Sequence, residues 1–184
     1  MNSREAEDFL AKAIPRGRGV WADLGAGSGT FTRALAHILG PGSTIYAVDR
    51  DTGAIAALER AGAVDGVKLI PMIGDFTRAL ELPPSGRGKL DGLLLANALH
   101  FASEPAQVLA RLVEWLRPGG NVVLIEYDRR RANRWVPYPI DVERLAGIAE
   151  SAGLSPPVVS GSMPSRYTGI IYIARFSYGP RALA

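Results

Sequence analysis

The apolar positions of this chain alternate between short continuous runs and stretches with helical spacing. Between the runs, apolar residues recur every three or four positions, as Phe31, Leu35 and Ile38 do, which is typical of amphipathic helices. The run at residues 90–96 is apolar enough to be buried on both faces, which favours a parallel strand. The runs predict buried strands at residues 20–24, 44–48, 67–72, 90–96 and 121–127.

Capping and helix-breaking residues set the expected ends of the helices. Asp51 is expected to cap one helix and Asp141 another, and each helix is expected to end at a glycine, Gly62 or Gly153. Pro105 is expected to start a helix that the sequence Arg-Pro-Gly-Gly ends. A polar loop is expected at 82–88, and helices over residues 3–13, about 31–39, 52–60, 105–116 and 142–152.

The C-terminal tail differs from the rest of the chain. Residues 157–160 and 169–176 resemble two strands, and the sequence between them is too short for a crossover helix, so we expect an antiparallel pair. The whole pattern predicts an α/β fold with a doubly wound, mostly parallel seven-stranded sheet, an antiparallel C-terminal strand and helices on both faces. At 184 residues, one domain over 1–184 is expected.

Composition narrows the classes of function. Without cysteine the chain has no disulfide or thiolate metal site, and two histidines are too few for a histidine cluster, so no metal is expected. The N-terminus is charged and lacks a long apolar stretch, which predicts neither a signal peptide nor a membrane segment and favours a cytoplasmic location. The net charge of +3 is modest for a nucleic-acid-binding protein.

A glycine-rich turn follows the first expected strand, in the sequence DLGAGSG at residues 23–29. Its glycines lack Cβ atoms, so a ligand can lie against the backbone amides where the next helix begins. Thr30 stands where a dinucleotide fingerprint has its third glycine, which favours a ligand without a pyrophosphate. Asp49 ends the second strand, where a carboxylate can accept both hydroxyls of a ribose. Together these residues predict a nucleoside site.

Here the chain resembles the class I S-adenosylmethionine-dependent methyltransferases. Their first motif, acid-x-Gly-x-Gly-x-Gly, matches Asp23 to Gly29, and their acid after the second strand matches Asp49. The resemblance implies the cofactor S-adenosylmethionine, the product S-adenosylhomocysteine and transfer of a methyl group by in-line displacement. The cofactor-binding residues that we expect are Asp23, Gly25, Ala26, Gly27, Gly29, Asp49, Arg50, Asp75, Phe76 and Asn97.

The resemblance also implies individual roles for some of these residues. It places Asp23 near the methionine part of the cofactor and Asp75 at the amino group of the adenine, next to a backbone amide and an apolar face from Phe76. Alternatively, Asp23 caps the glycine turn and Asp75 is an ordinary turn residue. Arg50 could lie over the adenine or simply be exposed.

Asn97 and His100 are the candidate catalytic residues. Asn97 stands where methyltransferases that modify the amino groups of adenine or glutamine have Asn/Asp-Pro-Pro-aromatic, but this chain lacks both prolines, which disfavours that reaction. His100 could take a proton from a hydroxyl or ring nitrogen, because imidazole exchanges protons near neutral pH. The alternative is a histidine packed beside Phe101, and His37 is expected to be structural.

The segment 128–140 is a candidate lid because it combines arginines with aromatic residues and two prolines. Such residues suit an anionic or planar small substrate, or an RNA surface. Alternatively, its apolar residues dock on the sheet and its arginines stay in water. The candidate substrate residues are Tyr127, Arg129, Arg131, Arg134, Trp135 and Tyr138.

We therefore expect a methyltransferase with a small-molecule acceptor. RNA methylation is the main alternative. Two further alternatives are a non-catalytic cofactor-binding subunit and a nicotinamide oxidoreductase. The oligomeric state is open, with a homodimer as one option.

Overall fold

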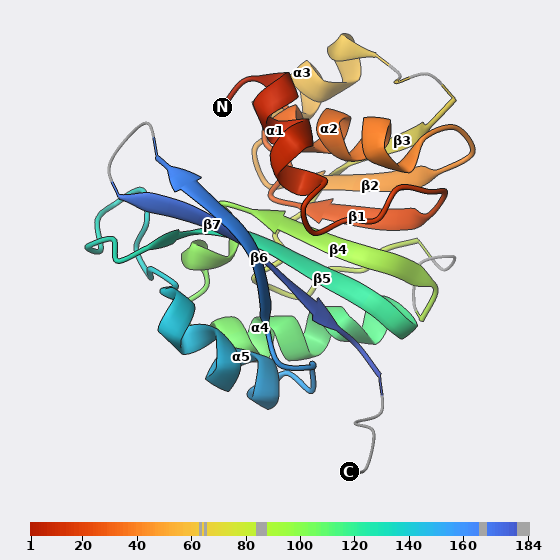
Figure 1. The fold of residues 1–184 in the computed structure, drawn as a ribbon. Helices are drawn as coiled ribbons and strands as arrows, with labels where there is room; N and C mark the ends of the chain where they lie inside the picture. Colours follow the sequence, from red (N-terminus) through yellow and green to blue (C-terminus); the bar gives the residue numbers. More distant parts are fainter. Residues whose placement is uncertain (63, 65, 84–87, 166–168, 180–184) are drawn as a thin grey trace.

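The computed structural model describes residues 1–62, 64, 66–83, 88–165 and 169–179, and a single twisted sheet runs through them (Figure 1). Its strands follow the order β3-β2-β1-β4-β5-β7-β6, in which the first five are parallel and β7 is antiparallel to both of its neighbours. The direction of winding reverses between β1 and β4, and ligands bind at such a point in doubly wound folds. The strands are β1 Val20–Leu24, β2 Thr44–Asp49, β3 Lys68–Ile73, β4 Leu90–Ala96, β5 Leu116–Asp128, β6 Val158–Pro164 and β7 Ile170–Ser177.

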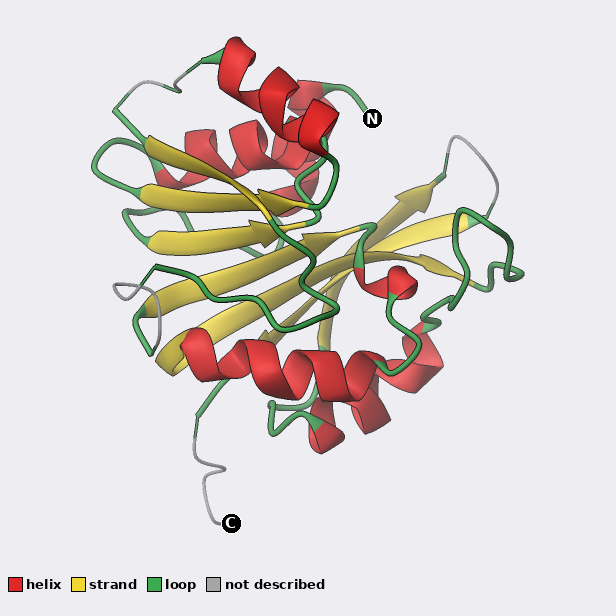
Figure 2. Cartoon of the chain, turned by 180° about the vertical axis from the view of Figure 1, so that it is seen from behind, coloured by secondary structure: helices red, strands yellow, loops and turns green. Residues whose placement is uncertain are grey.

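Helices cover both faces of the sheet (Figures 1 and 2). Helices α1, α2 and α3 lie on one face, and α4 and α5 lie on the other. The helices are α1 Ser3–Leu10, α2 Thr30–Leu39, α3 Thr52–Ala61, α4 Pro105–Leu112 and α5 Leu145–Ser151, with short 3₁₀ helices η1 Leu99–Phe101, η2 Val113–Trp115 and η3 Val142–Arg144. In the part of the chain that the structure describes, none of them is long and apolar enough to cross a membrane.

Alternate residues of the central strand enter the two opposite layers of the core. Leu94 of β4 packs in the layer that contains Phe9 of α1, whereas Leu93 and Leu95 pack in the layer that contains Leu109 of α4. A strand buried on both faces needs apolar residues at successive positions, which is why its sequence is a continuous apolar run. The predicted fold class is confirmed.

Several local predictions are also confirmed. The Asp51 carboxylate caps α3 by accepting hydrogen bonds from the amides of Gly53 and Ala54, at 2.8 and 3.2 Å, and Gly62 follows the last turn. The two C-terminal strands pair antiparallel, although β6 extends to Pro164, beyond the predicted residue 160.

Other predicted boundaries were wrong. The fifth strand begins at Leu116 rather than at residue 121, because Leu116 pairs with Leu90 and the Gly119 amide donates to the Tyr178 carbonyl at 2.6 Å. The preceding α-helix therefore ends at Leu112, and α1 ends at Leu10 instead of residue 13. Residues 84–87 of the predicted polar loop lie outside the described residues.

Asp141 does not cap a helix with its side chain, contrary to the prediction. Its carboxylate accepts a hydrogen bond from the Arg129 amide at 2.8 Å. The amide of Val142 instead donates to Asp128 at 3.1 Å. The chain begins as the 3₁₀ helix η3 there and continues as α5, with Gly153 just past its end, as predicted.

Candidate cofactor and acceptor site

The carboxyl ends of four neighbouring parallel strands meet around one cavity at the switch point. Gly25 follows β1, Asp49 ends β2, Asp75 follows β3 and Asn97 follows β4, and all four line this first cavity. Phe101 of η1 completes its wall. The topology therefore brings together the residues that the sequence placed after separate strands.

Four backbone amides of the glycine turn donate hydrogen bonds within the protein. The amides of Gly25 and Ala26 both donate to the Val48 carbonyl, at 2.8 and 3.0 Å, and the Gly29 amide donates to Ala26. The Gly27 amide donates to the Asp49 carboxylate at 2.7 Å. These four amides therefore shape the turn, and close approach of a ligand to the start of α2 stays a prediction.

Two of the glycines are needed for different reasons. Gly25 has a φ of +81°, and a Cβ there would lie 2.6 Å from the Cβ of Ala98, so this position has no room for a side chain. Gly27 has a φ of +53°, but a Cβ there would meet nothing within 4 Å. The space beside Gly27 is therefore open to a ligand.

Asp49 is held in place by two backbone donors. Its Oδ2 accepts the hydrogen bond from Gly27, and its Oδ1 accepts one from the Asp51 amide at 2.9 Å. A carboxylate has about four lone-pair sites, so each oxygen can accept one further donor. The half-buried Asp49 lines the cavity and can thus accept two hydroxyl groups from a ligand.

Asp75 is a second carboxylate that lines the same cavity. Its Oδ1 accepts hydrogen bonds from the Thr77 amide and hydroxyl, at 3.0 and 2.6 Å. Burial raises the pKa of the Asp75 carboxyl, but the bonds from Thr77 and the positive charges of Arg50 and Arg78 outweigh burial and lower the pKa. Phe76 is buried beside it, and Arg50 lies over the Phe101 ring at 5.5 Å.

Asp23 is completely buried at the end of β1, below the glycine turn. Its Oδ2 accepts a hydrogen bond from the Thr32 hydroxyl at 2.6 Å, which ties β1 to α2. Burial raises the pKa of the Asp23 carboxyl to about 7, although the Thr32 bond opposes the rise, and the charge of Asp49 adds to it. The contact that the structure shows for Asp23 is therefore with the helix that follows the turn.

A second, larger cavity of about 470 Å³ adjoins the first. Asn97 and Phe101 line both cavities and form their common wall. The second cavity is lined further by His100, Tyr127, Arg130, Trp135 and Val136. Its volume suits a small organic molecule.

Asn97 occupies this common wall in an unusual conformation. Its φ is +54°, in the left-handed region that few residues other than glycine adopt, and its amide donates to the Ile125 carbonyl at 2.7 Å. Its Oδ1 is buried and has no hydrogen-bond partner in the described part of the chain. A buried acceptor without a partner is costly, so this atom is suited to a donor from a ligand.

Comparison with known proteins decides the family. A family model described as "Methyltransferase domain" matches residues 22–122, which is more than half of the chain. The chain belongs to this methyltransferase-domain family. The matched residues include the glycine turn, Asp49, Asp75, Asn97 and His100 of this methyltransferase domain.

Curated relatives match the methyltransferase domain over part of their own length. A protein named "Probable cobalt-precorrin-6B C(15)-methyltransferase (decarboxylating)" from Pyrobaculum aerophilum is 34% identical over 104 residues, which are 52% of this chain and 53% of that protein. An uncharacterized methyltransferase from Mycobacterium bovis is 30% identical over 132 residues, which are 72% of this chain and 48% of that protein. The chain thus spans about half the length of these relatives.

Solved structures show the same fold. A 1,6-didemethyltoxoflavin-N1-methyltransferase from Burkholderia thailandensis, solved with 1,6-didemethyltoxoflavin and S-adenosylhomocysteine bound, superimposes with a TM-score of 0.71 at 24% identity, covering 96% of this chain and 78% of that one. A SAM-dependent methyltransferase from Aquifex aeolicus gives a TM-score of 0.68 at 18% identity, covering 94% of this chain and 88% of that one. At these identities the likeness shows the fold of the domain.

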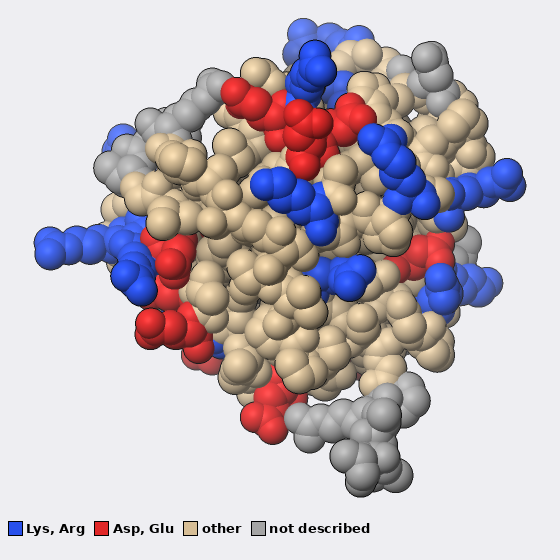
Figure 3. All heavy atoms as spheres, viewed as in Figure 1, with Lys and Arg blue, Asp and Glu red and all other residues tan. Residues whose placement is uncertain are grey.

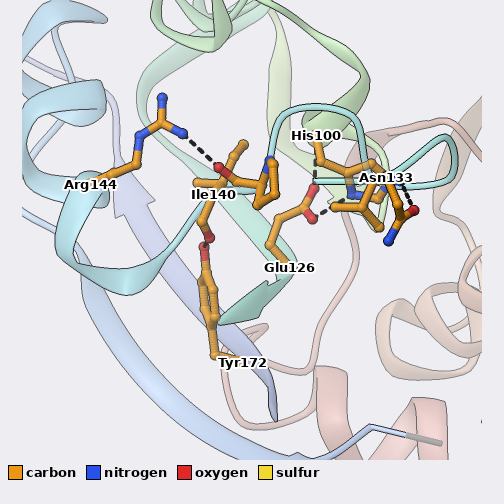
Figure 4. Close-up of polar contacts among 8 residues, drawn as sticks. His100, Glu126, Asn133, Ile140, Arg144 and Tyr172 are labelled. Carbon is orange, nitrogen blue, oxygen red and sulfur yellow. Dashed lines mark hydrogen bonds and ion pairs between the residues drawn. The ribbon is translucent and has the colours of Figure 1, made fainter. Parts of the chain in front are cut away.

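His100 of the methyltransferase domain is buried and paired with a carboxylate that the sequence analysis did not single out. Its Nδ1 lies 2.7 Å from Oε2 of Glu126, and its backbone amide donates to Oε1 of the same residue at 3.1 Å. Figure 4 shows the two side chains pointing toward each other from η1 and β5. The His100 ring also contacts Phe101, with 4.5 Å between the ring centroids. The His100 ring therefore packs beside Phe101 and is also oriented by Glu126, so the packing does not exclude a catalytic role.

The segment 128–140 is docked beside this histidine (Figure 4). Val136 and Ile140 are buried, and the Tyr138 amide donates to the His100 carbonyl at 3.0 Å. The buried Tyr172 hydroxyl donates to the Ile140 carbonyl at 2.7 Å, and burial raises the pKa of this hydroxyl, which keeps it protonated (Figure 4). The segment thus forms a fixed wall of the second cavity.

The structure separates the candidate substrate residues into two groups. Tyr127 and Trp135 line the second cavity, and Trp135 is 65% exposed at its edge. The side chains of Arg129, Arg131, Arg134 and Tyr138 are exposed and do not line it. Arg130, from the same arginine cluster, lines the cavity instead, although it was not among the candidates.

On the face of the methyltransferase domain shown in Figure 3, lysines and arginines are interspersed with acidic side chains. The charged groups lie in the upper half, near the centre and at the left and right edges of this face, and the lower central area is largely uncharged. This face therefore has no continuous basic surface of the kind that follows a nucleic-acid backbone.

Proposed function

We propose that this chain is an S-adenosylmethionine-dependent methyltransferase that acts on a small-molecule acceptor. The observation that carries the proposal is the pair of cavities that share Asn97 and Phe101. A nucleoside cofactor in the first cavity and an acceptor in the second would meet at this wall. Membership of the methyltransferase family supports the reaction class.

The residues around the first cavity fit the cofactor. The open space beside Gly27, the spare acceptor sites of Asp49 and the buried Asn97 Oδ1 suit a ligand with hydroxyl groups and a positively charged tail. We assign Asp49 to the ribose, Asp75 and Phe76 to the adenine, and the Gly25–Gly29 turn to close approach of the ligand. When bound, S-adenosylmethionine supplies an activated methyl group with a neutral thioether as the leaving group.

The protein's main contribution is to position the acceptor and exclude water. Holding two reactants in line can supply roughly 7–11 kcal/mol of the barrier reduction. Asn97 and Phe101 would align the acceptor at the common wall, and His100 would take a proton from it as a general base.

A small-molecule acceptor is favoured over RNA. The second cavity has walls from η1, β5 and the docked segment, and its volume of about 470 Å³ matches a ligand-sized pocket. The mixed charges of the face in Figure 3 do not favour RNA.

The experiment is transfer of labelled methyl from S-adenosylmethionine into fractionated cell extract, with RNase-treated and protease-treated samples alongside. We expect the label in small molecules that resist both treatments. Loss of label after RNase treatment would instead indicate an RNA acceptor, and binding of S-adenosylhomocysteine without any transfer would indicate a non-catalytic subunit. An NADH titration that fails to displace S-adenosylhomocysteine would exclude the oxidoreductase alternative.

A further inference from the structure

Arg130 brings a positive charge to the second cavity, and no ion pair of its guanidinium is found among the residues that the structure describes. Its guanidinium lies over the Tyr127 ring at 4.2 Å, and its Nε is buried without a hydrogen-bond partner among the described residues. The two carboxylates closest to this segment in the sequence have other partners, because Asp128 pairs with Arg129 at 3.8 Å and Asp141 accepts a hydrogen bond from the Arg129 amide. A buried donor on a planar cation is suited to a carboxylate or another oxyanion from a ligand.

Glu126 determines which nitrogen of His100 can accept a proton. An ionised carboxylate only accepts hydrogen bonds, so its Oε2 requires a proton on Nδ1 of His100. Nε2 of the neutral ring is then left as an acceptor. The His100 ring lines the same cavity as Arg130, and the pair with Glu126 also stabilises the imidazolium that forms on protonation.

We propose that the second cavity binds a planar hydroxylated acceptor that carries a carboxylate. Its carboxylate pairs with Arg130, its flat body lies among Phe101, Tyr127 and Trp135, and its hydroxyl faces Nε2 of His100. Glu126 is a positioning residue that acts through His100. This inference rests on the proposed function and names the substrate class of the same site.

The reaction that this arrangement supports is O-methylation. The acceptor hydroxyl gives its proton to Nε2 of His100, and an oxygen lone pair forms the bond to the methyl carbon. The electron pair of the broken carbon–sulfur bond stays on sulfur, which converts the sulfonium to the neutral thioether of S-adenosylhomocysteine. The imidazolium beside Glu126 later releases its proton to water.

The test of acceptor class uses the S-adenosylhomocysteine-loaded protein and a panel of planar hydroxyaromatic acids, each with its uncharged counterpart, such as 3,4-dihydroxybenzoate and catechol. We expect at least one acid to bind at least tenfold more tightly than its counterpart. Arg130→Gln should remove that preference, whereas Arg60→Gln, on the exposed face of α3, should keep it. Preference for the uncharged members, or no binding by any acid, would overturn the proposal.

The other outcomes of the panel separate the two proposals. If Arg131→Gln weakens binding of the acid as much as Arg130→Gln does, the charge of the loop rather than Arg130 recognises the acceptor, and the assignment fails. Failure of the protein to bind S-adenosylhomocysteine at the start would instead count against the proposed function.

The role of Glu126 is tested with Glu126→Gln and the best acceptor from the panel. The fixed His100 amide holds the Gln oxygen, so the Gln amino group faces Nδ1 and requires the opposite tautomer, with the proton on Nε2. We expect kcat to fall at least tenfold while the acceptor KM changes less than twofold, and the ¹⁵N shifts of the His100 ring to show the exchanged tautomer. An exchanged tautomer with unchanged kcat, or an unchanged tautomer, would refute the assignment.

Discussion

Asp49→Asn tests the cofactor site most sharply because the change keeps the shape of the side chain. Both carboxylate oxygens of Asp49 accept backbone donors, at 2.7 Å from Gly27 and 2.9 Å from Asp51. Asn has one oxygen and one amino group, so one backbone N–H must face another donor. Leaving a backbone donor unsatisfied costs about 1–3 kcal/mol, and we expect the free energy of unfolding to fall by that amount.

The effect on binding comes in addition to the effect on stability. A hydrogen bond to a charged group contributes about 1.5–3 kcal/mol, which corresponds to roughly a tenfold to hundredfold loss of affinity. We expect the affinity for S-adenosylhomocysteine, measured by isothermal titration calorimetry, to fall by at least tenfold. Urea denaturation of the same variant gives the stability and confirms that the variant is folded.

Asp51→Asn is the matched control. Asp51 caps α3, and Asn is about as good a helix cap as Asp, so this neighbouring change should alter affinity by less than twofold. If Asp49→Asn binds S-adenosylhomocysteine as tightly as the unmodified protein does, Asp49 does not hold the ribose.

Three further predictions concern the residues around the glycine turn. The pKa of Asp23 is about 7 in the folded protein and about 3.8 when unfolded, so the stability that its protonated form contributes is complete below pH 3.8 and is lost as the pH rises through 7. The pKa difference corresponds to roughly 4 kcal/mol of unfolding free energy. Urea denaturation at several pH values should show this fall in stability for the unmodified protein but not for Asp23→Asn. Equal pH dependence of the two proteins would refute the raised pKa of Asp23. Gly27→Ala should fold, with a free energy of unfolding about 1 kcal/mol lower because of the positive φ at this position. Its affinity for S-adenosylhomocysteine should fall at least tenfold, because the new methyl group enters the open space beside the turn. Gly25→Ala should lose more stability than Gly27→Ala because its methyl group meets Ala98, and equal melting temperatures would contradict this.

The sequence was sufficient to predict the site residues that stand at the ends of strands, because their place depends only on the strand just before them. Asp49 ends one parallel strand and Asp75 follows Gly74 just past the end of another, and the sheet brings such ends to one edge. The order of elements was therefore sufficient to place them near the glycine turn.

Contacts between distant segments were harder to predict. Glu126 lies in the run 121–127, where a charged residue in an otherwise apolar strand signals a buried partner, but only the fold shows that the partner is His100. Arg130 could not be told from Arg129 and Arg131 by sequence, because the turn of the backbone at Arg129, with a φ of +53°, determines which side chain enters the cavity.

A crystal structure of the protein with S-adenosylhomocysteine bound would show directly whether the cofactor and the acceptor can meet between the two cavities. We expect the ribose hydroxyls on Asp49, the adenine beside Asp75 and Phe76, and the sulfur at the wall that Asn97 and Phe101 share between the two cavities. A ligand bound elsewhere, or one whose sulfur faces away from the second cavity, would contradict methyl transfer at this site.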